Sequence, residues 1–176
     1  GESPEVDVVE AEKNLREVLL LYPKSSLAPV LSNTFATYNL RSGRPEKSLA
    51  IFTEARQRYP FSDLACVFQI GIAESHFQLK HTDQATRSFE QVLQKCQNPR
   101  LRVGAQARIA EGLFHSNPKK ANALLKAMME KNGQFVYQFY PETLYNIGEL
   151  RFSLKDYSGA KHYFTEVAGK TSALRP

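Results

Sequence analysis

The feature that most constrains this chain is a pattern of three residues that recurs along most of its length. Each copy has a small residue, then an aromatic residue or leucine four positions later, then a small or apolar residue three positions after that. The copies are Ala11/Leu15/Val18, Ser48/Phe52/Ala55, Ala85/Phe89/Val92, Ala121/Leu125/Met128 and Ala160/Phe164/Val167. Their first residues are 37, 37, 36 and 39 positions apart. Self-similarity at a nearly fixed period of this size predicts a repeat architecture.

The spacing of four and then three predicts the secondary structure of each copy. Such residues lie on one face of an α-helix, and a small residue lets a neighbouring helix cross closely. Ahead of each of the last four copies lies an apolar-periodic stretch that ends in turn residues, as in LRSGRPEKS at 40–48 and LKDYSGA at 154–160. Each copy therefore marks the second helix of a helical hairpin, and the stretch before it is the first helix.

This pattern resembles the tetratricopeptide repeat (TPR). The second helix of that motif carries a small residue, Phe, Ala and a terminal Pro, and Ser48, Phe52, Ala55 and Pro60 stand at those places. The chain departs from the motif in having no Trp near the start of any first helix. The resemblance implies an all-α fold, a right-handed TPR superhelix (α-solenoid) of antiparallel hairpins with about four and a half repeats.

The resemblance also divides the chain. It implies one TPR repeat domain over 1–176, with a half repeat at 5–23 and full repeats at approximately 25–60, 62–97, 98–133 and 140–172. The first copy has no complete first helix ahead of it, and the sequence stops soon after the fifth. We therefore expect the chain to be a fragment of a larger protein.

Tyr-Pro pairs mark two of the expected junctions, in LYPKSS and RYPFSD. Pro lacks a backbone N–H and disfavours helical geometry in the residue before it, so Pro23 and Pro60 are expected to end second helices. Ser25 or Ser26, and Ser62, can then accept hydrogen bonds from free N–H groups and cap the next helix. Lengthened repeats with such junctions resemble those of bacterial envelope proteins, namely the outer-membrane barrel-assembly lipoprotein and the periplasmic coordinator of the Tol-Pal system.

Two later prolines are expected to begin helices. Asn98 precedes Pro99, an arrangement in which Asn caps the helix and Pro takes its first position. Pro141 follows a tyrosine as Pro60 does, but it lies out of register with the repeat, so we expect it to start a helix.

Composition and motifs argue against several functional classes. The chain is 42% hydrophobic and 23% charged, and no apolar run approaches the roughly 18 residues of a membrane helix, so we expect a globular chain without a membrane-spanning segment. Metalloprotease, phosphate-loop, dinucleotide and nucleophile-elbow motifs are absent. A five-residue step places His76 and His81 on different faces of a helix. We therefore expect no enzyme activity, no cofactor and no metal site.

Basic residues gather near the third full repeat, and helical repeat proteins that read RNA exist. These residues are Lys95, Arg100, Arg102, Arg108, Lys119, Lys120, Lys126 and Lys131. Aromatic residues do not alternate with them as stacking platforms would. The net charge of +5 is too small to imply nucleic acid. The favoured interpretation is that these basic residues form a solvent-exposed face that keeps the chain soluble, and the alternative is that they bind RNA.

The two cysteines, Cys66 and Cys96, are a candidate disulfide. Counted from a turn near Thr82 they lie 16 residues before and 14 after it, at about the same height of an antiparallel hairpin. The alternative is two buried thiols, a common fate of free cysteine. A bond would indicate an oxidising compartment such as the periplasm.

Arrays of helical hairpins usually bind peptides on a concave wall made by the first helices. The resemblance matches this wall to Asn33, Thr37, Arg41, Ile70, Glu74, Gln78, Gln106, Phe114, Tyr145, Glu149 and Ser153. The set is polar with a few large apolar groups, which suits a peptide that needs both hydrogen bonds and an anchor.

These observations predict a non-catalytic scaffold that binds a protein or peptide partner on its concave face. The favoured role is bacterial envelope assembly, which would place the chain in the periplasm or at the outer membrane. The alternatives are a cytoplasmic or eukaryotic scaffold subunit of a large multiprotein complex, and an RNA-binding helical repeat.

Overall fold

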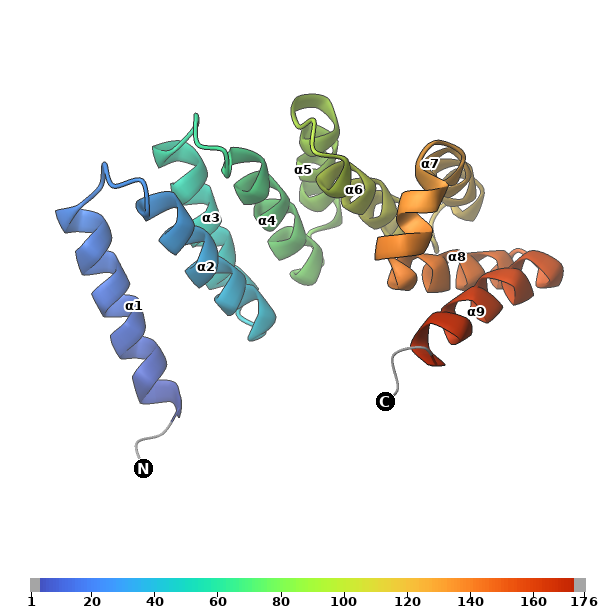
Figure 1. Ribbon diagram of the computed structural model, residues 1–176, viewed down its shortest axis with the longest axis horizontal. Helices are drawn as coiled ribbons and strands as arrows, with labels where there is room; N and C mark the ends of the chain where they lie inside the picture. The colour runs from blue at the N-terminus through green and yellow to red at the C-terminus, as the bar shows by residue number, and fades with distance from the viewer. Residues whose placement is uncertain (1–3, 173–176) are drawn as a thin grey trace. The chain divides into compact units, whose positions relative to one another are not determined.

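A computed structural model of the protein describes the backbone of residues 4–172 and the side chains of residues 10–169 apart from Phe139. Every element in this range is an α-helix (Figure 1). The helices are α1 (Pro4–Leu21), α2 (Ala28–Arg41), α3 (Pro45–Arg58), α4 (Ala65–Gln78), α5 (Thr82–Lys95), α6 (Pro99–Gly112), α7 (Pro118–Phe139), α8 (Pro141–Ser153) and α9 (Tyr157–Ser172). None of these described helices is both long and apolar enough to cross a membrane. Their packing in consecutive hairpins confirms the predicted all-α fold.

The chain forms two compact units, Gly1–Ser88 and Phe89–Pro176, here called the N-terminal unit and the C-terminal unit. In the N-terminal unit, α3 packs against both α2 and α4. The buried centre of this packing is made of Ala36, Phe52, Ala55 and Phe68. Helix α3 is therefore held by the helices before and after it in the sequence, as in other helical repeat arrays.

The packing of α3 against α4 depends on Gly71. A Cβ atom built at position 71 would lie only 2.3 Å from Cε2 of Phe52, so the ring occupies the space where a side chain would begin. Close-packed interiors do not allow such an approach, and only glycine fits there. Beside this contact, the Ser75 hydroxyl donates to the Ser48 hydroxyl over 3.2 Å, and both side chains are fully buried.

In the C-terminal unit, α6, α7 and α8 share one hydrophobic core. Its members include Val103 of α6, Leu125 of α7 and Leu144 of α8. Helix α9 packs against α8 through another close crossing, in which a Cβ built at Gly148 would lie 2.6 Å from Cε1 of Phe164. A glycine against an aromatic ring therefore sets the distance between helices in both units.

Helix α7 contains a break that the sequence did not predict. Asn132 has φ −129° and ψ 15°, outside the helical range, and the helix resumes and runs on to Phe139. Val136 in this continuation is fully buried in the core. The added turns lengthen the spacing before Ala160, but Pro141 begins α8 only 19 residues before Ala160 whereas Pro99 begins α6 22 residues before Ala121, so the spacing rises only to 39 residues from the 36 or 37 found elsewhere.

The small residues of the repeated pattern lie where helices meet. Ser48, Ala85, Ala121 and Ala160 have exposed fractions of 0%, 2%, 0% and 2%. Ala11 of α1, in contrast, is exposed. The pattern thus marks the buried face of four second helices, whereas α1 packs lightly on the described residues.

Both Tyr-Pro junctions end a helix as predicted, because α1 stops at Leu21 and α3 at Arg58. The prediction that the serines after these prolines cap α2 and α4 is wrong, because their hydrogen bonds lie in the turns before these helices. Ser25 Oγ accepts a hydrogen bond from the N–H of Leu27 over 3.2 Å, and Ser62 Oγ accepts one from the N–H of Leu64 over 3.1 Å. Since Leu27 and Leu64 are themselves the cap residues, the serines stabilise the turns before α2 and α4.

The two prolines expected to begin helices do so. Asn98 caps α6 with its side-chain oxygen, which accepts a hydrogen bond from the N–H of Arg100 over 2.9 Å. Pro99 is the first residue of α6, and Pro141 is the first residue of α8. Local chemistry that can be read from the sequence therefore sets these boundaries.

The expectation that His76 and His81 face away from each other is wrong. Helix α4 ends at Gln78, and Lys80 adopts a left-handed φ of 61°, so the chain reverses. The Nδ1 atoms of the two rings come within 3.4 Å of each other. Partial burial, together with His81 and Arg87, lowers the pKa of His76 below its usual 6.5. Among the described residues, no group of three or more His, Cys, Asp or Glu side chains could hold a metal ion.

Two alanines of α7 provide a test of the repeat register. Ala121 is fully buried and Ala123 is exposed. Ala121→Arg forces a long charged group into a helix crossing and should lower the free energy of unfolding by about 3 kcal/mol or more. Ala123→Arg, measured by the same urea titration, should change it by less than about 0.5 kcal/mol. Equal losses in the two variants would refute the register.

The histidine pair predicts a pH dependence. Because the pKa of His76 is lowered by folding, the unfolded chain binds this proton first as the pH falls below about 6.5. Above pH 6.5 His76 is neutral in both states and does not lower the free energy of unfolding. As the pH drops from there through the folded pKa of His76, the free energy of unfolding falls. In an NMR titration of the ring, His81→Gln should raise the pKa of His76, and Arg87→Gln should raise it less. An unchanged pKa in His81→Gln would contradict this account.

Candidate functional site

The residues predicted to bind a partner fall on two surfaces, one in each unit. The surface of the N-terminal unit, here called the N-terminal surface, comprises Asn33, Thr37 and Arg41 of α2 with Ile70, Glu74 and Gln78 of α4. The surface of the C-terminal unit, here called the C-terminal surface, comprises Gln106 of α6, Phe114 beyond the end of α6, and Tyr145, Glu149 and Ser153 of α8. Their role in binding stays a prediction.

The N-terminal surface is built by two first helices that contact each other. On each helix the three residues are four positions apart, so they lie along one face. Thr37, Ile70 and Glu74 are half-buried, whereas Arg41 and Gln78 at the ends of their helices are exposed. The result is a row of polar groups with one apolar side chain among them.

Asn33 is the most informative residue of this surface. Its side-chain oxygen is buried, and no hydrogen-bond donor reaches it from any described residue. A buried polar atom without a partner lowers stability by about 1–3 kcal/mol, so such atoms are rare in folded proteins. Asn33 therefore holds an acceptor that the described residues leave unsatisfied, and its side chain would have to turn outward before a ligand N–H could reach this oxygen.

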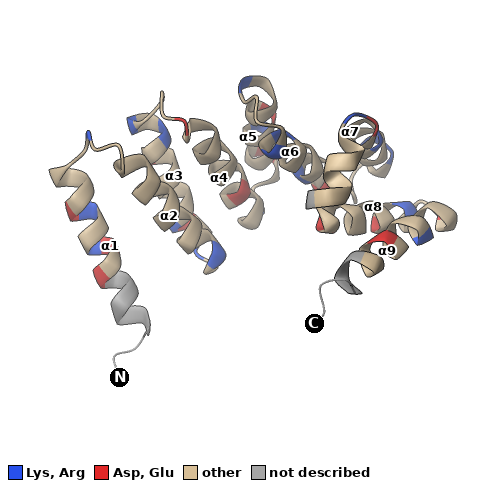
Figure 2. Cartoon of the chain, viewed as in Figure 1, with Lys and Arg blue, Asp and Glu red and all other residues tan. Residues whose placement is uncertain are grey.

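Charged groups of both signs lie on the two helices that build this surface. Arg41 lies in the last turn of α2 and Glu74 lies within α4. Figure 2 shows a basic segment at the end of α2 and an acidic segment on α4. A guanidinium can pair with a carboxylate of a ligand in a charge-assisted hydrogen bond. Beside them Ile70 can contact an apolar side chain, so the surface offers three kinds of contact within two helices.

The C-terminal surface is more aromatic. Tyr145 is 48% exposed, and its ring centroid lies 5.6 Å from that of Phe164. Ser153 donates its hydroxyl hydrogen to the carbonyl oxygen of Leu150 over 2.7 Å, so it closes the end of α8. Phe114 is half-buried against the core. Tyr145 and the exposed Glu149 are thus the side chains of this surface that are best placed to meet a partner.

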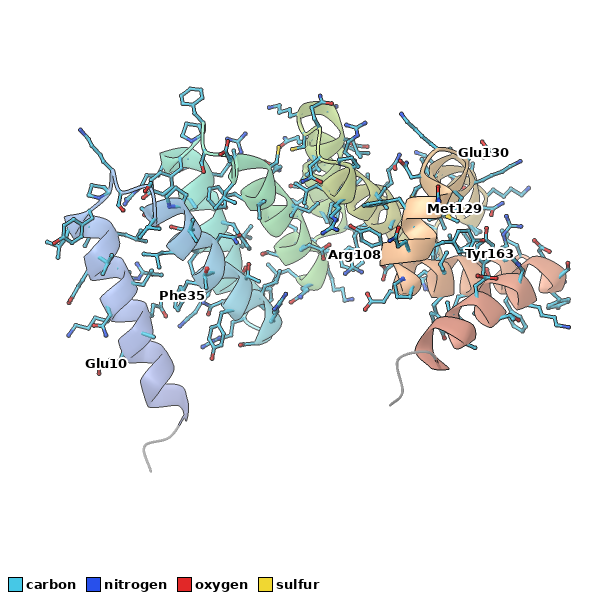
Figure 3. All side chains as sticks on the ribbon, viewed as in Figure 1. Glu10, Phe35, Arg108, Met129, Glu130 and Tyr163 are labelled. Carbon is cyan, nitrogen blue, oxygen red and sulfur yellow. The ribbon has the colours of Figure 1, made fainter. Side chains whose placement is uncertain are left out.

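Some basic residues of the third repeat already have protein partners. Arg102 donates to the carbonyl oxygens of Leu93 and Cys96, the latter over 3.0 Å, at the end of α5. Arg108, labelled in Figure 3, forms an ion pair of 2.8 Å with Glu111. Arg102 thus satisfies carbonyl groups that a helix terminus leaves open. These contacts give the two arginines structural roles.

Sequence reasoning missed two exposed aromatic residues in the C-terminal unit. Phe152 and Tyr157 have exposed fractions of 58% and 59%, on either side of the turn between α8 and α9. Their rings meet edge to face with centroids 5.4 Å apart. The sequence held a signal for them, since each helix carries an aromatic residue next to the turn, but aromatic residues in a repeat are more often core residues.

Neither Cys66 nor Cys96 is a free thiol in the structure. Cys96 is 2% exposed, at the residue immediately after α5. That these two cysteines are bonded to each other stays a prediction.

No protein-family model matches this sequence, and no curated protein matches it. Solved structures do match its fold. BtubC (BKLC) from P. vanneervenii is 15% identical, with a TM-score of 0.78 over 99% of this chain and 76% of that one. The nearly identical TPR-like repeats of a putative kinesin light chain from Podosopora anserina are 13% identical, with a TM-score of 0.67 over 98% of this chain and 91% of that one.

A third similar structure is a Rap protein in complex with competence and sporulation factor. It is 19% identical, with a TM-score of 0.63, and the match covers 96% of this chain but 55% of that one. At such identities the likeness establishes the fold and nothing more. The chain has a TPR-like repeat fold, an architecture that generally serves as a scaffold for protein–protein interaction.

Proposed function

We propose that this chain is a non-catalytic scaffold that binds an extended peptide, or an extended segment of a partner protein, on its N-terminal surface. The observation that supports this most directly is the buried side-chain oxygen of Asn33, which has no donor among the described residues. On binding, the Asn33 side chain turns outward and a backbone N–H of the peptide donates to this oxygen, so that binding removes a cost present in the unbound protein.

The neighbouring side chains give this proposal its chemical detail. Arg41 pairs with a carboxylate of the peptide, and Ile70 contacts an apolar side chain. Extended segments suit such a row, because their side chains repeat at short, regular distances along the backbone. The similar Rap protein was solved in complex with competence and sporulation factor, a finding that concerns that protein.

In the C-terminal unit, Tyr145 is the side chain that we propose for contact with a partner. Its ring is half exposed and braced by Phe164. A rigid aromatic side chain loses little conformational entropy on binding, and such residues are common at the centres of interfaces. We include Tyr145 and Glu149 in the proposed partner-binding set for this reason.

Two double variants test the N-terminal surface. Asn33→Leu with Arg41→Ala removes the acceptor and the cation, and the matched control, Asn14→Leu with Arg58→Ala, makes the same chemical changes at exposed positions of α1 and α3. Proteins captured from a lysate of the source cells are identified by mass spectrometry. A protein lost with the first variant and kept with the control supports the proposal, and its purified form should bind the first variant at least about tenfold more weakly, or about 1.4 kcal/mol.

The opposite result is equally clear. If the same proteins, or RNA, stay bound to both variants, another face carries the function. RNA capture would show itself by an affinity that falls steeply with salt. The Asn33→Leu change should not reduce the melting temperature, since it removes a buried oxygen without a partner, so loss of binding cannot be attributed to unfolding.

The cysteines bear on the compartment. We propose a bond between Cys66 and Cys96, which would persist in an oxidising compartment such as the bacterial periplasm and would break in a reducing cytoplasm. A bond in the protein from its source cells would favour the envelope-assembly role over that of a cytoplasmic or eukaryotic scaffold subunit.

Intact-mass measurement tests this bond. Protein taken from the source cells into iodoacetamide and denaturant should gain no carbamidomethyl group, and the same sample reduced first should gain two. Two groups without prior reduction would disprove the bond and remove the argument for an oxidising compartment. A Cys66→Ser variant, which should take up one group without reduction, controls for reagent access to Cys96.

A further inference from the structure

The turn between α4 and α5 brings two imidazole rings together, here called the histidine pair. His76 lies in the last turn of α4, and His81 lies just before α5 begins at Thr82. Their Nδ1 atoms are 3.4 Å apart, whereas the ring centroids are 5.6 Å apart, so each Nδ1 lies on the side of its ring that faces the other. His76 is half-buried and His81 is exposed, so the pair lies at the surface of the N-terminal unit.

The backbone of the turn produces this approach. The N–H of His81 donates to the carbonyl oxygen of His76 over 3.0 Å, and the N–H of Lys80 donates to that of Phe77 over 3.1 Å. Together with the left-handed φ of 61° at Lys80, these two hydrogen bonds form a Schellman motif at the end of α4. In this motif the side chains of the two residues joined by the first bond frequently contact each other. Here both of these residues are histidines.

The same motif recurs at the end of α8 and shows how closely it brings two side chains. Lys155 has a φ of 63°, and the N–H of Asp156 donates to the carbonyl oxygen of Arg151 over 2.9 Å. Arg151 and Asp156 hold the places that His76 and His81 hold after α4, and their side chains form an ion pair of 2.6 Å. The approach of the two histidines therefore follows from a backbone motif that this chain uses more than once.

The distance between the two Nδ1 atoms matches that of two ligands on one metal ion. Zinc binds imidazole nitrogens at about 2.0–2.1 Å with tetrahedral geometry, which places two such nitrogens about 3.3–3.4 Å apart. The χ2 torsion of histidine is broad, so a small rotation of each ring directs both lone pairs toward one ion. Imidazole is a good ligand for Zn²⁺, Cu²⁺ and Ni²⁺. The prediction that this chain has no metal site rested in part on the two rings facing apart, and the turn reverses that premise.

From this geometry we propose that the histidine pair binds one divalent transition-metal ion, Zn²⁺ in the first place, through the two Nδ1 atoms. In the metal-free protein one Nδ1–H donates to the other Nδ1. When the ion binds, the donating ring carries its hydrogen on Nε2 instead, so both Nδ1 lone pairs coordinate and no proton is lost. Water fills the remaining positions, because no third His, Cys, Asp or Glu side chain joins the pair within the described part of the chain. This site does not depend on the peptide binding proposed for the N-terminal surface.

One nearby positive charge opposes the ion. The pKa of His76 is lowered by partial burial and then by His81 and Arg87, so the charge of Arg87 acts at this ring. Two positive charges repel each other, and the repulsion weakens as their distance grows. Removal of the Arg87 charge should therefore strengthen metal binding.

Calorimetric titration of the metal-free, unreduced full chain with zinc chloride at neutral pH tests the proposal. One equivalent of Zn²⁺ should bind in a saturable manner. His81→Gln leaves a single imidazole and should weaken binding at least about tenfold. His115→Gln, the same change at an exposed histidine outside the pair, should leave the affinity unchanged. Arg87→Gln should increase the affinity.

Two changes at Lys80 test the role of the turn. Both remove the same positive charge, so they differ only in what the backbone can do. Lys80→Gly allows the left-handed conformation without steric cost and should retain zinc binding. Lys80→Val disfavours that conformation, because valine is β-branched, and should bind zinc at least about tenfold more weakly than Lys80→Gly. Equal affinities in these two variants would contradict the argument that the turn positions the rings.

Long-range ¹H–¹⁵N NMR of the imidazole rings locates the bound ion. The Nδ1 resonances of His76 and His81 should shift as zinc is added, and those of His115 and His162 should not. The proposal is overturned if binding is not saturable, if His81→Gln binds zinc as tightly as the unchanged chain, or if the resonances of the pair do not move. Such a failure leaves the peptide-binding proposal untouched, because none of these changes alters a residue of the N-terminal surface.

Discussion

The contact between an aromatic ring on a second helix and a small residue on its neighbour sets the geometry of both units. Phe52 and Phe164 hold the same place in the repeat, as do Ala36 and Gly148 on the first helices. Ala36 and Phe52 share a core cluster, and Phe164 lies where a side chain on Gly148 would begin. One side of the aromatic ring thus packs against the first helix of its own hairpin. The other side can pack against the first helix of the next hairpin.

The second face of this ring explains how the repeats join. In the N-terminal unit Gly71 closes over Phe52, and the hairpins become a continuous core. Each hairpin on its own would leave that side of the ring in water, so stability depends on contacts between neighbours rather than on any single hairpin.

The sequence predicted those parts of the fold that depend on short-range chemistry. The spacing of Ala121 and Leu125 marked a buried helix face, and Asn98 and Pro141 marked helix starts. It could not predict features that arise when a backbone leaves the regular pattern. The meeting of His76 with His81 needs the left-handed turn at Lys80, a conformation that lysine seldom adopts.

The sequence predicted which helix faces carry the candidate residues but not the chemistry of their surroundings. Helical spacing placed Asn33 and Thr37 on one face of α2, which the helix confirms. The unpartnered oxygen of Asn33 depends on which atoms of other helices come near it, and no pattern within one helix encodes that. The exposure of Phe152 likewise depends on whether another helix packs over α8 and α9, so its sequence alone reads as a core residue.

Tyr145 links the row of α8 side chains matched to partner binding with the packing of α8 against α9. Its ring centroid lies 5.6 Å from that of Phe164, and the Phe164 ring in turn occupies the space where a side chain on Gly148 would begin. Close-packed aromatic rings cannot shift independently. The position of the Tyr145 ring therefore depends on the same contact between glycine and an aromatic ring that sets the distance between α8 and α9.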